Sequence, residues 1–290
     1  MNAPFTWTCE TWRQKMQRLL KMYRPITGTP FKNNDSYREI LPCGALAPYI
    51  RCFWGTNIPA AKESAADIVI PDTCMDIVFR ANYYQNKLSG VFCAIDESSS
   101  ISQSDAETDI TAIFGIRFYA WTAVLFSDGD FSNVTGSRFC IEEFSQKIRA
   151  ALEPVLFDIP DLAGKISAAE KLLLETLCTS RINADLMNGI YYMLSTNGRA
   201  RISDICGYTA VSEKQLQRIF KSNVGISPKT FSSLVRYQLL WQEAVFSKSF
   251  SALDAVEKYG YTDQSHMLRD FKRRHLMTVT EALEFANKNR

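Results

Sequence analysis

The spacing of apolar residues changes near residue 140 of this 290-residue chain. Before that point, short apolar or alternating runs recur between clusters of Pro, Gly, Asn, Asp and Ser, which is typical of short β-strands joined by turns. Because no helical pattern separates these runs, a β-sandwich or β-barrel is predicted. The predicted strands are residues 49–54, 67–70, 75–79, 90–95, 110–118 and 123–126, and residues 98–104 are a predicted polar loop.

After residue 140 the apolar positions take a helical period. Ile141–Leu152 and Lys165–Cys178 each carry an apolar stripe, and residues 183–288 are helical in pattern throughout. A basic amphipathic helix is also predicted over Thr11–Tyr23; it packs on its own domain, or contacts DNA or a membrane. The predicted fold is α+β, with an N-terminal β-barrel-like domain with flanking helices (1–140), a helical linker that packs on the barrel or on a second copy (141–182), and an all-α C-terminal domain (183–290).

The C-terminal part contains an internal repeat with an offset of 51 residues. Placing Phe220 over Phe271 also places similar residues over one another on both sides. The aligned pairs are Leu216 with Met267, Arg218 with Arg269, and Lys221 with Lys272. Two copies of one helical unit are therefore predicted.

Each copy has the parts of a helix-turn-helix unit, in which a short helix and a turn precede a second helix. Ser212 and Asp263 are good N-caps for the second helices, predicted over residues 213–222 and 264–274. Leu216, Phe220, Met267, Leu268 and Phe271 are expected to face inward.

Ser227 and Pro228 open a long helix that runs to about Phe246 and joins the two copies. A helix of this length spans roughly 27 Å. That length can hold two recognition helices about one duplex turn apart, so that both enter successive major grooves.

Charge is divided unevenly along the chain. The net charge is only +2, yet residues 1–180 hold 17 Lys and Arg against 21 Asp and Glu, whereas residues 181–290 hold 16 against 10. A basic C-terminal third behind an acidic front indicates a nucleic-acid-binding module.

The C-terminal motifs carry a family resemblance. The stretches ISDICGYTAVSEKQLQRIFKSNVGISPKTF and YGYTDQSHMLRDFKRR, with Arg236 between them, resemble the DNA-binding domain of AraC/XylS-type transcription regulators. Departures are Ala210 in the first turn, and Leu276, Val279 and Ala282 where the second unit usually has Gly, Pro and an aromatic residue. The front half more weakly resembles the family's cupin-like N-terminal domains, through residues 46–49, 70–72 and 115–118.

This resemblance implies a cytoplasmic, nucleoid-associated bacterial activator that binds double-stranded promoter DNA and RNA polymerase, answers to a small-molecule effector and forms a homodimer or stays monomeric. Arg reads guanine and Gln or Asn reads adenine, whereas Lys, Ser and Thr more often hold phosphates. Arg218 and Arg269 could instead bridge to acidic neighbours, and His266 could be an idle surface residue. The expected DNA contacts are Lys214, Gln217, Arg218, Lys221, Gln264, Ser265, His266, Arg269, Lys272 and Arg273, with Lys229 on the backbone.

The front domain is less informative. Its aromatic residues are either plain core or the wall of an effector site, with Arg51, Asp76 or Arg117 as polar anchors. The residues named for the ligand are Trp54, Asp76, Phe114, Arg117 and Trp121.

Other functions remain as alternatives. The eight cysteines allow a redox- or metal-responsive regulator, or a cysteine-based DNA repair enzyme fused to a DNA-binding domain, yet they form no Cys-x-x-Cys pair and no metal-ligand spacing. No catalytic motif stands out, so no enzyme activity, cofactor or metal is expected. No run of 18 apolar residues predicts a membrane helix, and the N-terminus does not resemble a secretory signal.

Overall fold

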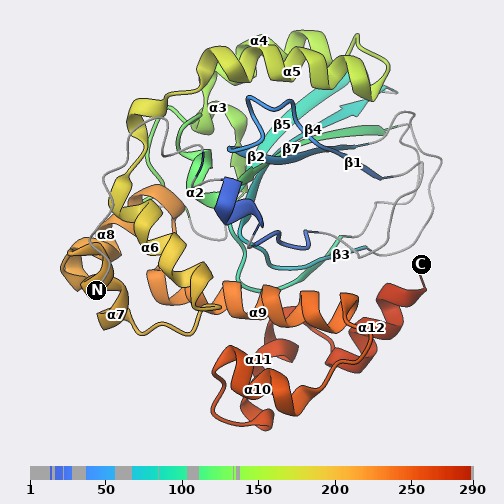
Figure 1. Ribbon diagram of the computed structural model, residues 1–290. Coiled ribbons are helices and arrows are strands. Elements are labelled where there is room, and N and C mark those ends of the chain that lie inside the picture. The colour runs from blue at the N-terminus through green and yellow to red at the C-terminus, as the bar shows by residue number, and fades with distance from the viewer. Residues whose placement is uncertain are drawn as a thin grey trace.

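The computed structural model describes residues 14, 17–21, 23–27, 37–55, 67–83, 85–102, 111–132, 134 and 138–288. It confirms the predicted division into an antiparallel β-domain and a helical C-terminal domain. In Figure 1 the β-domain lies above helix α9 (Pro228–Phe246), which belongs to the C-terminal domain. Among the described residues, no helix has the length and apolar composition needed to cross a membrane.

The β-domain is built on a six-stranded antiparallel sheet with the order β1-β2-β7-β4-β5-β8. A second sheet pairs β3 with β6 and lies on the side of helix α9 (Figure 1). The strands are β1 (Arg38–Ile40), β2 (Ile50–Gly55), β3 (Asp67–Val69), β4 (Cys74–Asn82), β5 (Lys87–Cys93), β6 (Ser100–Ser102), β7 (Thr111–Tyr119) and β8 (Arg138–Cys140).

The two faces of the large sheet differ in chemistry because successive residues of a strand point to opposite sides. One face, with Phe53, Phe114 and Phe79, is apolar, and these rings stack at centroid distances of 6.0 and 6.4 Å. Helices α3 (Ile141–Phe144), α4 (Gln146–Leu156) and α5 (Leu162–Thr176) cover it (Figure 1). The α5 stripe packs into this core, so the linker helices rest on their own domain.

The C-terminal domain consists of helices joined by short turns, as the pattern predicted. The 3-10 turn η1 (Thr179–Arg181) leads into it. Its helices are α6 (Ala184–Ser195), α7 (Ile202–Thr209), α8 (Glu213–Val224), α9, α10 (Ala252–Tyr259), α11 (Gln264–His275) and α12 (Val279–Asn287). Helix α8 lies at the N-terminal end of α9, and α10 and α11 lie beneath its C-terminal half (Figure 1).

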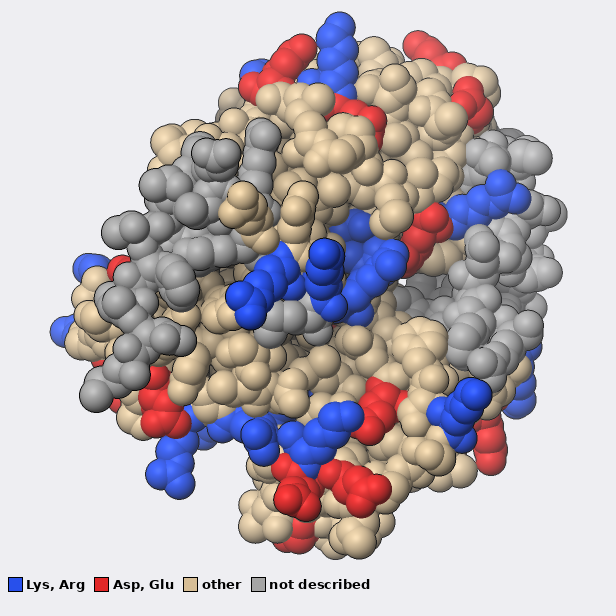
Figure 2. Space-filling model, in the orientation of Figure 1, with Lys and Arg blue, Asp and Glu red and all other residues tan. Residues whose placement is uncertain are grey.

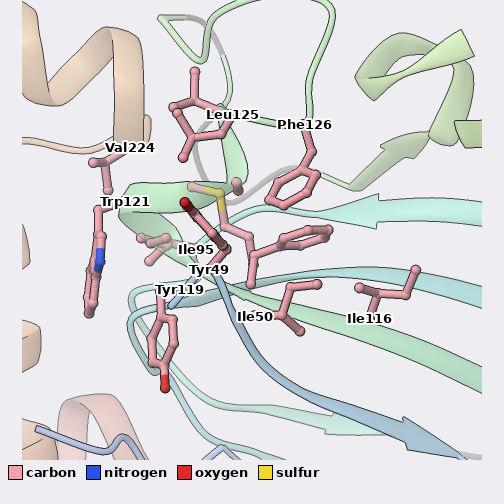
Figure 3. Packing of buried hydrophobic residues seen from close by; sticks show 14 of the residues in the cluster. Tyr49, Ile50, Ile95, Ile116, Tyr119, Trp121, Leu125, Phe126 and Val224 are labelled. Atoms are coloured by element: carbon pink, nitrogen blue, oxygen red, sulfur yellow. The ribbon is translucent and has the colours of Figure 1, made fainter. Parts of the chain in front are cut away.

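The two domains share their hydrophobic cores. Trp121 of helix α2 (Ala120–Ala123) meets the ring of Phe231 of α9 edge to face at 6.1 Å, and Figure 3 shows it beside Val224 of α8. Ile68 and Ile70 of the β-domain join a second core around Trp241 of α9. Each half of α9, and each helix-turn-helix unit with it, is therefore packed against the β-domain.

Gln238 is the polar centre of this junction. Its side chain is fully buried in α9, where its Nε2 donates to the carbonyl oxygens of Ile26 and Pro71 at 3.0 and 2.7 Å. Its Oε1 accepts from the Ile26 amide at 2.8 Å. One side chain thus ties α9 to two separate segments of the front domain.

Several predicted elements were wrong. The expected strand at residues 123–126 is the end of α2 and a turn, because a short, wholly apolar run fits a buried helix as well as a strand. The expected loop at 98–104 contains β6, whose Ser-rich sequence gives no strand signal. Ser145 divides the helix expected at 141–152, because it is extended and its side chain caps α4, which continues through Pro154.

The predicted N-terminal helix is partly described. Residues 17–21 are helical, and the rest of the expected span lies almost entirely outside the described residues. Leu19 is fully buried in the main core, which favours the reading in which this helix packs on its own protein.

Replacing Gln238 tests the junction. Gln238→Leu keeps a similar volume but leaves two buried carbonyl oxygens and one amide without a partner, at roughly 1–3 kcal/mol each before relaxation. We expect a total loss of about 3 kcal/mol, measured as a lower midpoint in urea unfolding. The control Gln146→Leu, at an exposed position of α4, should leave the midpoint nearly unchanged. Equal midpoints for the two variants would contradict this role of Gln238.

Candidate nucleic-acid interface

Helix α8 has one buried apolar side and one exposed polar side. Ser212 accepts from the amide of Gln215 at 3.2 Å and begins the helix, as predicted. Leu216 and Phe220 are fully buried beneath it. The helix ends at Gly225, whose φ of +79° is left-handed and disfavours any residue with a side chain. Both ends and the buried side of the helix are thereby fixed.

Helix α11 repeats this construction. Asp263 accepts from the amide of His266 at 2.7 Å, and Met267 and Phe271 are fully buried. The helix ends at Leu276, which adopts a left-handed φ of +64° where the family resemblance leads one to expect glycine. Leu268, expected to face inward, is 37% exposed, because the adjacent Met267 already fills the contact with α9.

The turns within the two units are alike. Ala210 ends α7 with a φ of +58°, and Gly260 ends α10 with a φ of +67°. The departure at Ala210 therefore keeps the left-handed conformation and bears some strain. Helix α12 follows the second unit, and Thr278 and Glu281 form a capping box at its start, so a normal helix follows in spite of the missing Gly and Pro.

The residues expected to contact DNA lie on the outer sides of these helices. Neither Arg218 nor Arg269 has an ion pair with any described acidic residue, so neither is held as an internal bridge. Arg273 is 68% exposed and pairs with Asp270 at 2.5 Å. The exposed members are Lys214, Arg218, Gln264, Ser265, His266, Arg269, Lys272 and Arg273, together with Lys229, whereas Gln217 and Lys221 are half-buried.

Gln217 and Lys221 are half-buried on the side of α8 that faces α9 and the front domain. They line a pocket of about 520 Å³ between the start of α9 and the β5–β6 segment of the front domain, which contributes Glu97. Lys221 Nζ donates to the carbonyl oxygen of Gly225 at 2.7 Å. Glu97 and the cationic residues Arg218 and Lys221 of α8 therefore line the same pocket.

Backbone contacts fix the β5–β6 segment in this position. The amide of Ser99 donates to the carbonyl of Arg274 at 2.7 Å, and Arg274 Nη1 donates to the carbonyl of Glu97 at 3.1 Å. Arg274 is 3% exposed and its Nη2 also donates to Ser233 of α9 at 2.8 Å. The segment is thus joined to the C-terminal end of α11 while it faces α8.

His275 holds the end of α11 in place. Its ring stacks on Phe271 at 4.8 Å, and its Nδ1 shares a hydrogen bond with the Tyr237 hydroxyl at 2.7 Å. Burial lowers the pKa of His275 to about 4, so the imidazole is neutral at pH 7. The neutral ring is the form that can accept this hydrogen bond.

A second cluster of functional interest lies on the polar face of the β-sheet. Arg117 pairs across the strands with Asp76, and its Nε lies 2.9 Å from Asp76 Oδ1. Trp54 Nε1 donates to the same oxygen at 2.8 Å, and the guanidinium lies 5.4 Å from the Trp54 ring centroid. The structure therefore brings together three of the five residues named for a ligand. Gly115 leaves room for the Trp54 indole, because a Cβ there would lie 2.0 Å from the ring.

The other two lie elsewhere. Phe114 points to the opposite, apolar face of β7, because it is one residue out of phase with Gly115. Trp121 is 2% exposed in the contact between the domains, where it stacks on Tyr119 at 5.1 Å. Both are core residues, which was the alternative reading of the aromatic residues.

The sequence did not single out Glu39, Tyr37 or Asp72, which also belong to the polar face. Glu39 Oε1 accepts from the Tyr37 hydroxyl at 2.9 Å, and the Arg117 and Arg51 guanidiniums lower the pKa of Glu39. Burial raises the pKa of Asp72 to about 7. The available signal was a charged residue inside each of three otherwise largely apolar strands, namely Arg51 in β2, Asp76 in β4 and Arg117 in β7, whereas the exposed pattern of β1 gives no such signal.

The cysteines show no reactive arrangement among the described residues. Burial raises the pKa of Cys52 to about 12 and that of Cys93 to about 11, so both stay protonated at neutral pH. No three metal-ligating side chains gather within the described part of the chain.

Comparison with known proteins finds separate matches for the β-domain and for the helical C-terminal domain. Residues 205–284 match a family described as "Helix-turn-helix domain", and residues 38–139 match "Domain of unknown function (DUF6597)". The C-terminal domain is therefore a helix-turn-helix domain of the AraC type, a kind of domain with which transcription regulators bind DNA. No curated protein gives a significant match.

Solved structures of ToxT from Vibrio cholerae are similar at low identity. The P21 form is 14% identical over 77% of this chain and 95% of ToxT, with a TM-score of 0.41. ToxT from strain SCE256 bound to an unsaturated fatty acid is 13% identical over 88% and 97%, with a TM-score of 0.40. A similarity at these TM-scores says nothing about what this chain binds.

The pKa of His275 predicts a pH dependence. An unfolded histidine has a pKa near 6.5, so the neutral ring contributes fully above about pH 6.5 and its contribution is lost as the pH falls toward 4. At pH 4 the loss is at most about 3 kcal/mol. His275→Phe should be less stable at pH 7, because Tyr237 loses its partner, but its stability should fall less between pH 7 and 4.5. His266→Gln, at an exposed site, should keep the wild-type slope; a wild-type slope in His275→Phe would contradict the assignment.

Proposed function

We propose that this protein is a promoter-binding regulator that reads DNA with α8 and α11 and is controlled by a small effector in its N-terminal domain. The observation that carries the proposal is the matched pair of capped helices, each with a buried apolar side and an accessible cationic side, on either half of α9. The 19 residues of α9 span about 28 Å, which suits contact with two successive major grooves.

The two kinds of contact divide among the named residues. Lys214, Gln217 and Arg218 on α8 read bases, as do Gln264, Ser265, His266 and Arg269 on α11. Lys221, Lys229, Lys272 and Arg273 hold phosphates and set the register. The same proposal divides the chain at residues 140 and 182, and takes the regulator to be an activator that contacts RNA polymerase.

The polar face of the β-domain supports the effector part of the proposal. Glu39 on this face accepts a hydrogen bond from Thr27 of the segment Tyr23–Thr27. Gln238 of α9 is hydrogen-bonded to this segment and to the segment Pro71–Thr73. An effector that moves these segments acts directly on α9, the helix that connects the units of the DNA-reading helices α8 and α11. The raised pKa values of Cys52 and Cys93 favour this reading over a redox sensor, since thiols that stay protonated react poorly.

Arg218→Ala tests base reading. Loss of one bidentate contact should cost roughly 1–3 kcal/mol of specific binding, about 5- to 150-fold in Kd, with little change in nonspecific binding. The measurement is a gel shift with the protein's own upstream DNA and with a scrambled duplex, on protein whose circular dichroism matches wild type. Lys147→Ala, exposed on α4, is the control. Unchanged specific affinity in Arg218→Ala would refute the assignment.

Glu97→Gln tests whether the negative charge of the β5–β6 segment weakens DNA binding. Glu97 lines the same pocket as Arg218 and Lys221, so removing its negative charge should strengthen DNA binding about threefold at low salt, and the gain should fade as salt screens the charge. Glu143→Gln removes an equally exposed charge on α3 and should have no such effect. Equal affinities of Glu97→Gln and Glu143→Gln for DNA would show that Glu97 does not oppose it.

A further inference from the structure

Arg51 is a buried cation that lacks hydrogen bonds. Its side chain is 8% exposed, and neither Nε nor Nη1 has a partner. A guanidinium carries five N–H donors, and leaving a buried charge unsatisfied costs free energy. Its ion contact, from Nη2 to Glu39 Oε2, measures 3.5 Å, whereas a charged hydrogen bond is about 2.7–2.9 Å long.

Arg117 on the same sheet face shows what a satisfied guanidinium looks like. Its Nε lies 2.9 and 3.2 Å from the two oxygens of Asp76. Its Nη1 reaches Glu39 Oε1 at only 3.4 Å. The Glu39 carboxylate therefore lies between two guanidiniums without a close contact to either.

Glu39 is a replaceable partner. It comes from the three-residue edge strand β1, and its side chain is 29% exposed, against 7–8% for the two arginines. A free carboxylate can approach Arg51 in better geometry than one fixed to this strand. Beside it, the rings of Tyr37 and Trp54 lie 5.7 Å apart with their planes tilted by 36°, and offer aromatic surface.

We propose that the polar face of the sheet binds a small molecule with a carboxylate group, which pairs with Arg51 in the place that Glu39 now holds. This inference rests on the proposed function, in which the N-terminal domain holds an effector. A carboxylate is the class indicated, because a carboxylate already occupies the position and a flat guanidinium matches it. Figure 2 shows several Lys and Arg side chains close together near the middle of the side of the molecule that it draws.

Displacing Glu39 has a consequence for α9. Thr27 donates its hydroxyl to Glu39 Oε1 at 2.9 Å, and the preceding residue, Ile26, is held by Gln238 through both its amide and its carbonyl. A ligand that moves Glu39 removes one anchor of this segment. The carboxylate site is thereby connected to the helix that carries both DNA-reading units.

Calorimetric titration with benzoate tests the site, with benzamide as the neutral match and inorganic phosphate as a different anion. We expect benzoate to bind the full-length protein, to bind Glu39→Gln about tenfold more tightly because the internal competitor is neutral, and not to bind Arg51→Gln. Arg149→Gln, which changes an exposed arginine of α4, should behave as wild type. Near-ultraviolet circular dichroism checks that Arg51→Gln is folded.

Three results would overturn the proposal: benzamide or phosphate binding as tightly as benzoate, benzoate binding equally to Arg51→Gln, or no benzoate binding even to Glu39→Gln. A gel shift on the same preparations separates this from the DNA-binding role. If DNA binding fails while benzoate binds as expected, the carboxylate site stands and the function does not. If the protein binds DNA but does not bind benzoate, only the proposed carboxylate site is refuted.

Discussion

The burial of helix α9 between the two domains is the constraint on which the rest of the structure depends. Its first half packs through Phe231 into the core of the β-domain, and its second half packs through Trp241 against Ile68 and Ile70. Gln238 lies between these halves and is bonded to the backbone of the front domain. Because each helix-turn-helix unit packs on α9, their relative position depends on the front domain as well as on the helix.

The distribution of charge follows from this arrangement. In the front domain, Arg51, Arg117, Glu39 and Asp76 are gathered on one sheet face, where they interact mainly with one another. In the C-terminal domain, Arg218 and Arg269 are exposed and unpaired among the described residues. In the function and the site that we propose, the first set binds a small charged molecule and the second binds a polyanion, although the net charge of the whole chain is only +2.

The C-terminal domain could be predicted closely because its signals are local. Ser212, Asp263, Ser227 and Gly260 have the cap and turn roles that their residue types favour, and the 51-residue repeat marks which faces are equivalent. Leu268 was misplaced because Met267 and Phe271, four residues apart, share the helix face that packs in the core with α9, whereas Leu268 lies beside that face and is 37% exposed.

The front domain was predicted less well because its features depend on pairing between distant strands. Trp54, Asp76 and Arg117 come together through the register of β2, β4 and β7. A shift of one residue would place Phe114 on that face instead, and composition cannot exclude such a shift. Glu39 was missed for the same reason, since a three-residue edge strand has no pattern of its own.

The most direct test of the account is selection of binding sites from a library of random duplexes by the full-length protein. The account predicts an enriched site with two conserved blocks whose centres lie about one helical turn apart, roughly 10 base pairs. Each block should be read by one of the two units, so Arg218→Ala should relax one block and Arg269→Ala the other. Enrichment of a single block that neither substitution alters, or no enrichment at all, would contradict it.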